Sequence, residues 1–142
     1  MERPQESGAV GGRREPLSEP PPNPKGGRTL IVDARDPHAY IRPSAALKEA
    51  GETDQVFIRP GVYEDKVFVA DRPVLLIGAG RDHVQIYSRR GGPLYLQRVP
   101  SGMISGITFR YAGSDQHSAI NVVDSVCTVT QCRATEGVLS GV

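Results

Sequence analysis

Hydrophobic residues in this chain are grouped in short runs that begin at Thr29 and recur toward its end. Glycine, proline and other turn-forming residues separate the runs, a pattern typical of short strands joined by turns. The first run, residues 29–32, has the β-branched and aliphatic residues of a buried strand. Eight further strands are expected within residues 56–58, 66–69, 74–77, 83–87, 94–96, 103–109, 119–123 and 126–134. Strands so closely spaced leave no room for the helical crossovers of an α/β protein.

One segment has the pattern of a helix. Residues 44–50 read Ser-Ala-Ala-Leu-Lys-Glu-Ala, with Pro43 before them and Gly51 after them. We expect Ser44 to be the N-cap and Gly51 to stop the helix. Its partly apolar face predicts that the helix lies against the strands.

Two strand patterns recur at nearly one period, which favours a solenoid over a sandwich. Ile104, Ile107 and Phe109 have the apolar spacing i, i+3, i+5, and residues 129–134 repeat it 25 positions later. Residues 94–96 and 120–122 share an i, i+2 spacing at an offset of 26. We interpret the wider spacing as a β-bulge kept in register between stacked units. A period of about 25 residues fits one three-strand coil of a parallel β-helix, and the Leu and Asn framework of a leucine-rich repeat is missing.

The expected fold is therefore all-β: a right-handed parallel β-helix of about four coils with a short N-terminal capping helix, within residues 28–142. Residues 1–27 hold six of the twelve prolines and few large aliphatic residues. They are expected to form a disordered Pro/Gly-rich leader. Its proline run at 20–24 has the composition of an SH3-type or WW-type ligand, but we favour a solvated leader. The expected inward positions are Val56, Ile58, Val67, Val69, Leu94, Leu96, Ile104, Ile107, Phe109, Ile120, Val122, Val129 and Cys132.

Three segments carry a resemblance to a known family. They are residues 54–63 (Asp-Gln-Val-Phe-Ile-Arg-Pro-Gly-Val-Tyr), 72–81 (Arg-Pro-Val-Leu-Leu-Ile-Gly-Ala-Gly-Arg) and 102–109 (Gly-Met-Ile-Ser-Gly-Ile-Thr-Phe). Residues 29–142 thereby resemble the N-terminal portion of the pectin-lyase-like right-handed β-helix superfamily. Its members include pectin-degrading enzymes, periplasmic sugar-binding or copper-accessory repeats, and carbohydrate-binding and sugar-hydrolase repeats of some F-box ubiquitin-ligase subunits. The resemblance implies that the helix at 44–50 plugs the N-terminal end of the solenoid.

The distant resemblance to pectin methylesterases does not extend to their catalytic residues. Those enzymes have His-Gln-Ala-Val where this chain has residues 117–120, so Ser118 replaces the oxyanion-binding Gln. Val138 and Leu139 stand where a second Gln and the catalytic Asp belong. Valine and leucine neither transfer a proton nor stabilise negative charge. We therefore assign no catalytic residue and expect no methylesterase activity.

Glycosidase chemistry requires two carboxylates at a defined separation. The candidates are Asp115, Asp124 and Glu136. The two aspartates flank the strand at 119–123, and we interpret them as turn residues. Glu136 has no visible partner, so no carboxylate pair is assigned.

Metal and cofactor sites are not expected. The histidines at 38, 83 and 117 show no metal-ligand spacing, and Cys127 and Cys132 are not spaced as a zinc pair. Both cysteines continue the inward pattern and are interpreted as core residues.

Charge and composition limit the classes of partner that we expect for this chain. The 142 residues contain 17 Lys and Arg against 16 Asp and Glu, and a net charge of +1 argues against a nucleic-acid binder. Two cysteines fit a reducing compartment, and no segment has the apolar stretch of a signal peptide or membrane span. We therefore expect a cytoplasmic protein with no membrane partner.

Two functions remain open. The first is a non-catalytic module that binds a glycan or a protein; the alternative is the N-terminal part of a carbohydrate-active enzyme whose catalytic residues lie beyond Val142. The last coil, around residues 126–132, is expected to leave apolar surface open for self-association. For the binding module, aromatic and cationic residues near strand ends suit stacking on sugars and hydrogen bonding. These candidate ligand-binding residues are Tyr87, Arg89, Arg90, Tyr95, Arg110 and Tyr111.

Overall fold

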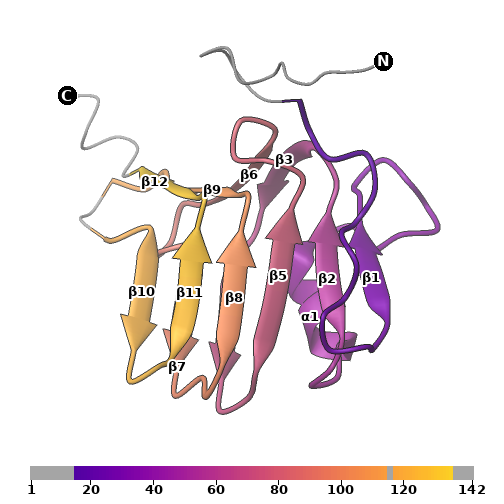
Figure 1. Ribbon diagram of the computed structural model, residues 1–142. Helices are drawn as coiled ribbons and strands as arrows, with labels where there is room; N and C mark the ends of the chain where they lie inside the picture. Colours follow the sequence, from indigo (N-terminus) through magenta and orange to yellow (C-terminus); the bar gives the residue numbers. More distant parts are fainter. Residues whose placement is uncertain (1–14, 115–116, 136–142) are drawn as a thin grey trace.

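The computed structural model describes residues 15–114 and 117–135, which form a β-solenoid with one short helix (Figure 1). Asp115 and the segments 1–14 and 136–142 lie outside the described residues. The helix is α1 (Pro43–Glu49). The strands are β1 (Thr29–Val32), β2 (Gln55–Ile58), β3 (Gly61–Glu64), β4 (Val67–Ala70), β5 (Val74–Gly78), β6 (Val84–Ser88), β7 (Leu94–Gln97), β8 (Gly102–Ser105), β9 (Thr108–Tyr111), β10 (Ile120–Val123), β11 (Cys127–Thr130) and β12 (Arg133–Thr135).

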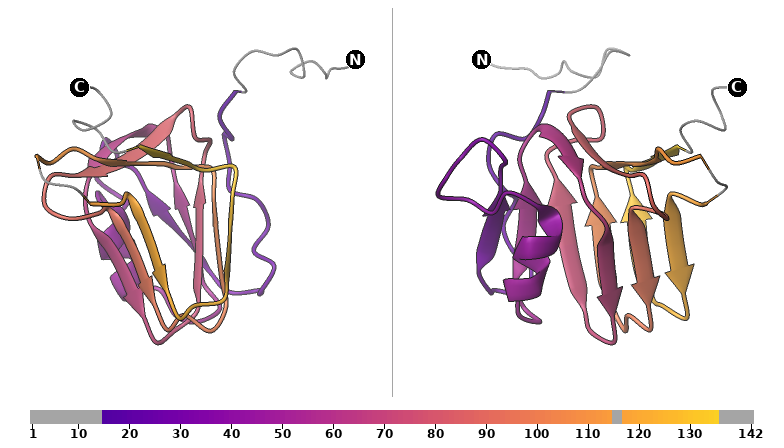
Figure 2. Two further views of the ribbon diagram at one scale, coloured as in Figure 1. Left: turned by 90° about the vertical axis from the view of Figure 1, so that its left-hand side faces the viewer. Right: turned by 180° about the vertical axis from the view of Figure 1, so that it is seen from behind.

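The strands stack into three parallel sheets. Sheet A has the order β1-β2-β5-β8-β11, sheet B the order β12-β9-β6-β3, and sheet C the order β10-β7-β4. The chain climbs in sheet A, crosses to sheet B and descends in sheet C before the next coil begins, which makes the winding right-handed (Figure 1). Viewed along its axis, the molecule encloses its core between the three sheets (Figure 2). The predicted right-handed parallel β-helix of about four coils is confirmed.

The repeat seen in the sequence is the stacking register of the solenoid. Leu94 pairs with Ile120 in sheet C, and Ile104 pairs with Val129 in sheet A. Coil length varies elsewhere: Val56 pairs with Leu76, 20 residues on, and Leu76 pairs with Ile104, 28 residues on. The additional residues enter the turns, so the paired strands keep their register.

The interpretation of the i, i+3, i+5 spacing as a bulged strand is wrong. Residues 102–111 form two strands, β8 and β9, which belong to different sheets and meet at Gly106. Gly106 has φ 75° and Gln131, 25 positions later, has φ 50°, so a left-handed residue turns the chain at the same corner of successive coils. The extra residue in the spacing is this corner residue.

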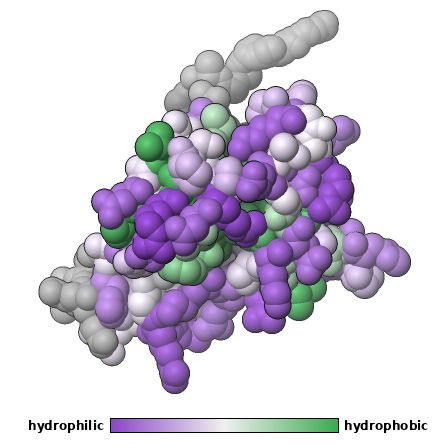
Figure 3. Space-filling model, turned by 90° about the horizontal axis from the view of Figure 1, so that it is seen from below, coloured by the Kyte–Doolittle hydropathy of each residue, from purple (hydrophilic) through white to green (hydrophobic). Residues whose placement is uncertain are grey.

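A second corner, between sheets C and A, repeats in the same way. Asp71, Arg98 and Asp124 have φ values of 62°, 51° and 48°, so each coil turns here through one left-handed residue. The Arg98 guanidinium donates to both carboxylate oxygens of Asp71, at 2.6 and 2.9 Å. Seen from below, the side of the solenoid that carries these corners is mostly hydrophilic (Figure 3).

Burial of the inward side chains depends on cover from both sides, by a neighbouring coil or, for Val67 and Val69 on the edge strand β4, by α1. The nine expected inward positions from Val56 to Phe109 are all buried. In the last coil, Ile120 and Cys132 are only half-buried, and Val122 and Val129 remain 44% and 36% exposed. These residues stack on the coil before them, but no strand of the described residues follows β10, β11 or β12 in its sheet. Self-association through this coil stays a prediction.

Helix α1 packs against β1, β2 and β4 and buries Pro43, Ala46 and Leu47. It thus covers the N-terminal end of the core. The expected N-cap is wrong, since Arg42 occupies that position without a side-chain hydrogen bond. Asp65 satisfies the first turn instead, because its carboxylate accepts from the Ser44 N–H at 2.7 Å and from the Ser44 hydroxyl at 2.8 Å. The structure therefore assigns the capping role to a distant carboxylate rather than to Ser44.

The described part of the leader, residues 15–27, lies along the solenoid. The Leu17 N–H donates to the Ala79 carbonyl at 2.9 Å, and the Gln55 side-chain amide donates to the Pro21 carbonyl at 2.8 Å. Asn23 donates to the carbonyls of Arg28 and Thr53 at 3.0 and 2.9 Å. Contacts with the solenoid thus begin before the expected boundary at residue 28.

Asp54 joins the residue before β1 to the turn that follows α1. Its carboxylate accepts from the Arg28 backbone N–H at 2.9 Å, from the Arg28 guanidinium at 2.7 Å and from the Gly51 N–H at 2.8 Å. The Arg28 side chain and these N–H donors lower the pKa of Asp54 to about 2. The folded state therefore favours the ionised form of this carboxylate.

Truncating two valines on one inward ladder tests the effect of coil coverage. Val56 is 0% exposed and Val129 is 36% exposed, so the same substitution removes different amounts of packing. We expect Val56→Ala to lower the free energy of unfolding by about 2 kcal/mol and Val129→Ala by less than about 1 kcal/mol. Urea unfolding followed by circular dichroism measures both. Equal losses would show that coverage by a following coil does not set the burial energy.

Asp54 contributes to the decrease of the free energy of unfolding at acidic pH. Its pKa in the folded state lies below the unfolded value of about 3.9, so ionised Asp54 stabilises the fold above about pH 4. This contribution is lost as the pH falls toward 2. We expect Asp54→Asn to lower the free energy of unfolding at pH 6 and to flatten its decline between pH 4 and pH 2. Glu52→Gln, which removes a nearby exposed carboxylate, is the control. An unchanged pH profile in Asp54→Asn would contradict this assignment.

Candidate functional site

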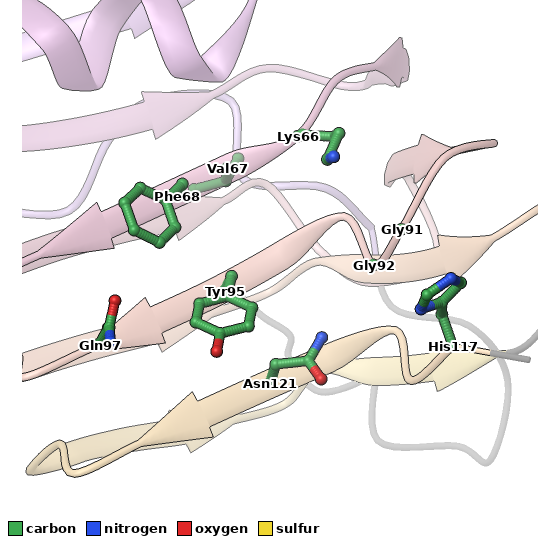
Figure 4. Close-up of a pocket in the computed structure, with 9 residues that line it drawn as sticks. All are labelled: Lys66, Val67, Phe68, Gly91, Gly92, Tyr95, Gln97, His117 and Asn121. Atoms are coloured by element: carbon green, nitrogen blue, oxygen red, sulfur yellow. The ribbon is translucent and has the colours of Figure 1, made fainter.

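The outer face of sheet C presents a row of side chains at one register position. Val67 and Val69 point into the core, so Phe68 between them points outward. Phe68 pairs with Tyr95 on β7, and Tyr95 pairs with Asn121 on β10. The three side chains therefore form a ladder across three coils, and Figure 4 shows them side by side.

This ladder forms the floor of an open groove with a volume of about 480 Å³. Gln97, at the end of β7, also lines the groove, and the turn before β7 contributes Gly91 and Gly92. Lys66 and His117 stand at the end of the groove near these glycines (Figure 4). The described residues that line the groove are Lys66, Val67, Phe68, Gly91, Gly92, Tyr95, Gln97, His117 and Asn121.

The two aromatic rings of the groove form a pair. Their centroids lie 5.6 Å apart with an interplanar angle of 38°. Phe68 is 60% exposed and Tyr95 is 37% exposed, so both rings face solvent from rigid strands. An exposed aromatic pair of this kind is suited to contact the apolar face of a ring-shaped ligand.

Polar groups flank the aromatic pair. The Asn121 amide donates to the carbonyls of Leu94 and Ser118, at 3.3 and 3.1 Å, which fixes its orientation. Gly92 allows this arrangement, since a Cβ there would collide with the Ser118 carbonyl. Among the described residues, no carboxylate forms an ion pair with Lys66. The groove thus combines apolar rings with amide and ammonium groups.

A second aromatic cluster lies on sheet B. Glu64, Tyr87 and Arg110 share one register position there. The Arg89 and Arg110 guanidinium carbons lie 5.5 and 5.9 Å from the Tyr87 ring centroid, within cation–π distance. Glu64 accepts from the Tyr87 hydroxyl and from Arg89, each at 3.4 Å. These four side chains therefore make their cation–π contacts and hydrogen bonds mainly with one another.

The structure divides the candidate ligand-binding residues. Tyr87, Arg89 and Arg110 come together on sheet B, whereas Tyr95 lies in the sheet C groove. Arg90 is exposed at the corner between them, beside a shallow depression of about 530 Å³.

The choice of Tyr111 as an exposed residue is wrong. Tyr111 is 1% exposed, and its ring contacts His117 edge-on at a centroid distance of 5.1 Å. It lies two residues after the inward Phe109 on one strand, so alternation points it inward as well. Tyr111 is therefore buried and contacts the groove residue His117, and it offers no exposed ring to a ligand.

Sequence reasoning missed most of the groove. Lys66, Phe68, Gln97, His117 and Asn121 were not among the candidates, although His117 was considered as a metal ligand. A signal for Phe68 was present, because a large aromatic residue between two inward valines must face outward. The same alternation marks Asn121 between Ile120 and Val122.

The remaining chemical candidates have structural explanations. Asp124 has φ 48° at a corner, consistent with its interpretation as a turn residue. Burial raises the pKa of the Cys132 thiol, and Cys127 also packs at the edge of the core. No group of three or more His, Cys, Asp or Glu side chains suited to a metal ion occurs in residues 15–114 and 117–135.

Comparison of the chain with protein-family models, curated proteins and solved structures finds no match. Within the described part of the chain, no helix has the length and apolar character needed to cross a membrane.

Proposed function

We propose that this chain is a non-catalytic β-helix module that binds a glycan in the sheet C groove. The observation that carries the proposal is the exposed Phe68–Tyr95 pair, held in register on neighbouring strands beside polar side chains. The sequence resemblance to the pectin-lyase-like superfamily, which contains carbohydrate-binding repeats, supports the same proposal.

Each part of the groove matches a part of a sugar. The aromatic rings offer a flat apolar surface for the C–H face of a pyranose ring. Gln97 offers its amide and Asn121 its amide oxygen for hydroxyl groups, and Lys66 offers three N–H donors. All of these groups except His117 and the turn glycines are placed at or next to strands of sheet C, so little side-chain and backbone freedom is lost on binding.

The dimensions of the groove favour a glycan over a protein. A stable protein interface buries about 800 Å² on each partner, usually around an apolar centre. Among the described residues that line the groove, the exposed large apolar side chains are Phe68 and Tyr95, and amide and charged groups border them closely. Such a site resembles a small-ligand groove with a few orienting polar groups.

Substitution of Tyr95 tests the proposal. The probes are hexasaccharides of cellulose, xylan, chitin and homogalacturonan, with binding measured by isothermal titration calorimetry. We expect at least one to bind, and Tyr95→Ala to weaken its binding about tenfold because the stacking surface is removed. Tyr95→Phe keeps the ring and should retain most of the affinity.

Tyr87→Ala is the matched control, because it removes an outward tyrosine from sheet B and leaves sheet C unchanged. Loss of binding in Tyr87→Ala, with Tyr95→Ala unaffected, would move the site to sheet B. Failure of all four hexasaccharides to bind would overturn the proposed glycan module.

A further inference from the structure

The outer face of sheet A has an apolar strip that most solvent-facing β-surfaces lack. Val56 and Leu76 point into the core, so Phe57, Leu75 and Ile77 on the same strands point outward. These outward side chains are nevertheless buried, at 0%, 5% and 7% exposure. Something on the outside of the sheet must cover them.

The covering segment is the described leader. Its Leu17 end is fixed beside Ala79 and its Pro21 carbonyl beside Gln55, so it runs past the outer side of β5 and β2. Figures 1 and 2 show this segment outside sheet A. At the edge of the leader, Met103 is the register neighbour of Leu75 and borders a groove with Pro24, yet it is 42% exposed. Burial of the outer face therefore stops where the leader stops.

Proline determines how the leader is held. Four of the five residues 20–24 are prolines, which have no N–H and cannot pair as a β-strand. Pro20 and Pro21 are half-buried, and the Pro21 carbonyl faces the sheet. The buried Gln55 amide donates to that carbonyl, the kind of contact by which grooves recognise extended proline-rich peptides.

We propose that the outer face of sheet A is a docking groove for an extended proline-rich peptide, and that the leader occupies it in cis. A partner segment of the same chemistry, with apolar and proline residues flanking an exposed carbonyl, binds by displacing the leader. The leader is then an autoinhibitory ligand of this second site, which is separate from the sheet C groove.

The tether strongly favours the leader over a free competitor. A short connection gives it an effective concentration in the millimolar range, so the affinity of a free peptide is masked. The connection itself is ordered by Asn23, whose Oδ1 accepts from the Lys25 N–H at 2.8 Å and whose amide donates to Arg28 and Thr53. Asn23→Ala removes these bonds and leaves the groove residues unchanged.

The test uses the full chain and a fluorescent synthetic peptide with the sequence of residues 15–28. We expect Asn23→Ala to bind the peptide about fivefold more tightly than the wild type, because the leader competes less well. Leu17→Pro, which removes the N–H donated to Ala79, should act in the same direction and covers the case in which Asn23→Ala does not fold. A peptide with Pro20, Pro21 and Pro22 replaced by Asp should not bind.

Nuclear magnetic resonance of the complex locates the peptide. Displacement of the leader, with shifts at Gln55, Phe57 and Ile77, supports the proposal. A concentration-dependent dimer of Asn23→Ala that added peptide dissociates also supports it, with the leader of a second copy as occupant. No saturable binding to either weakened-leader variant, or binding confined to sheet B or C, would overturn it.

Discussion

In-register stacking of successive coils is the constraint on which the rest of the structure depends. Each inward side chain is fully buried only when it is covered from both sides, by a neighbouring coil or, for Val67 and Val69 at the edge of sheet C, by helix α1. The ladder Val56–Leu76–Ile104–Val129 shows the rule, since burial is complete in its first three members and incomplete in the last. Strand alternation extends the same register to the outer faces.

The outer ladders give each sheet a different surface. Sheet C exposes an aromatic pair beside amides, and sheet B exposes a tyrosine between arginines and a glutamate. Sheet A carries apolar side chains that the leader covers. Because the backbone beneath each face is the same parallel ladder, the chemistry of a face depends on which residues occupy its outward positions. This separation is compatible with the two sites that we propose, one for a glycan and one for a peptide, on one small solenoid.

The fold was predictable because in-register stacking makes the hydrophobic pattern of the sequence repeat at a nearly constant period. The offsets of 25 and 26 residues in the sequence correspond to Ile104–Val129 and Leu94–Ile120 in the stacked sheets. Local geometry was harder to predict from the sequence. The corner at Gly106 was interpreted as a β-bulge, because a corner and a bulge each insert one residue between inward positions. Tyr111 was misplaced although the same alternation that put Phe109 inside also applies to it.

The candidate site was only partly predictable. Tyr95 was identified from its residue type, but its partner Phe68 lies 27 positions away and became a neighbour only through the register. The leader could not be placed at all from sequence, because a proline run has no periodic pattern that indicates a contact. Its hydrogen bond with Gln55 spans 34 residues.

Chemical-shift mapping with a bound oligosaccharide tests the central claim most directly, that register builds a glycan site on sheet C. The ¹⁵N-labelled chain is titrated with the hexasaccharide that binds it best, and backbone and side-chain amides are followed. The account predicts saturable shifts at Phe68, Tyr95, Gln97 and Asn121, with sheets A and B unchanged. Shifts confined to the Tyr87 cluster, or spread evenly over all three sheets, would contradict it.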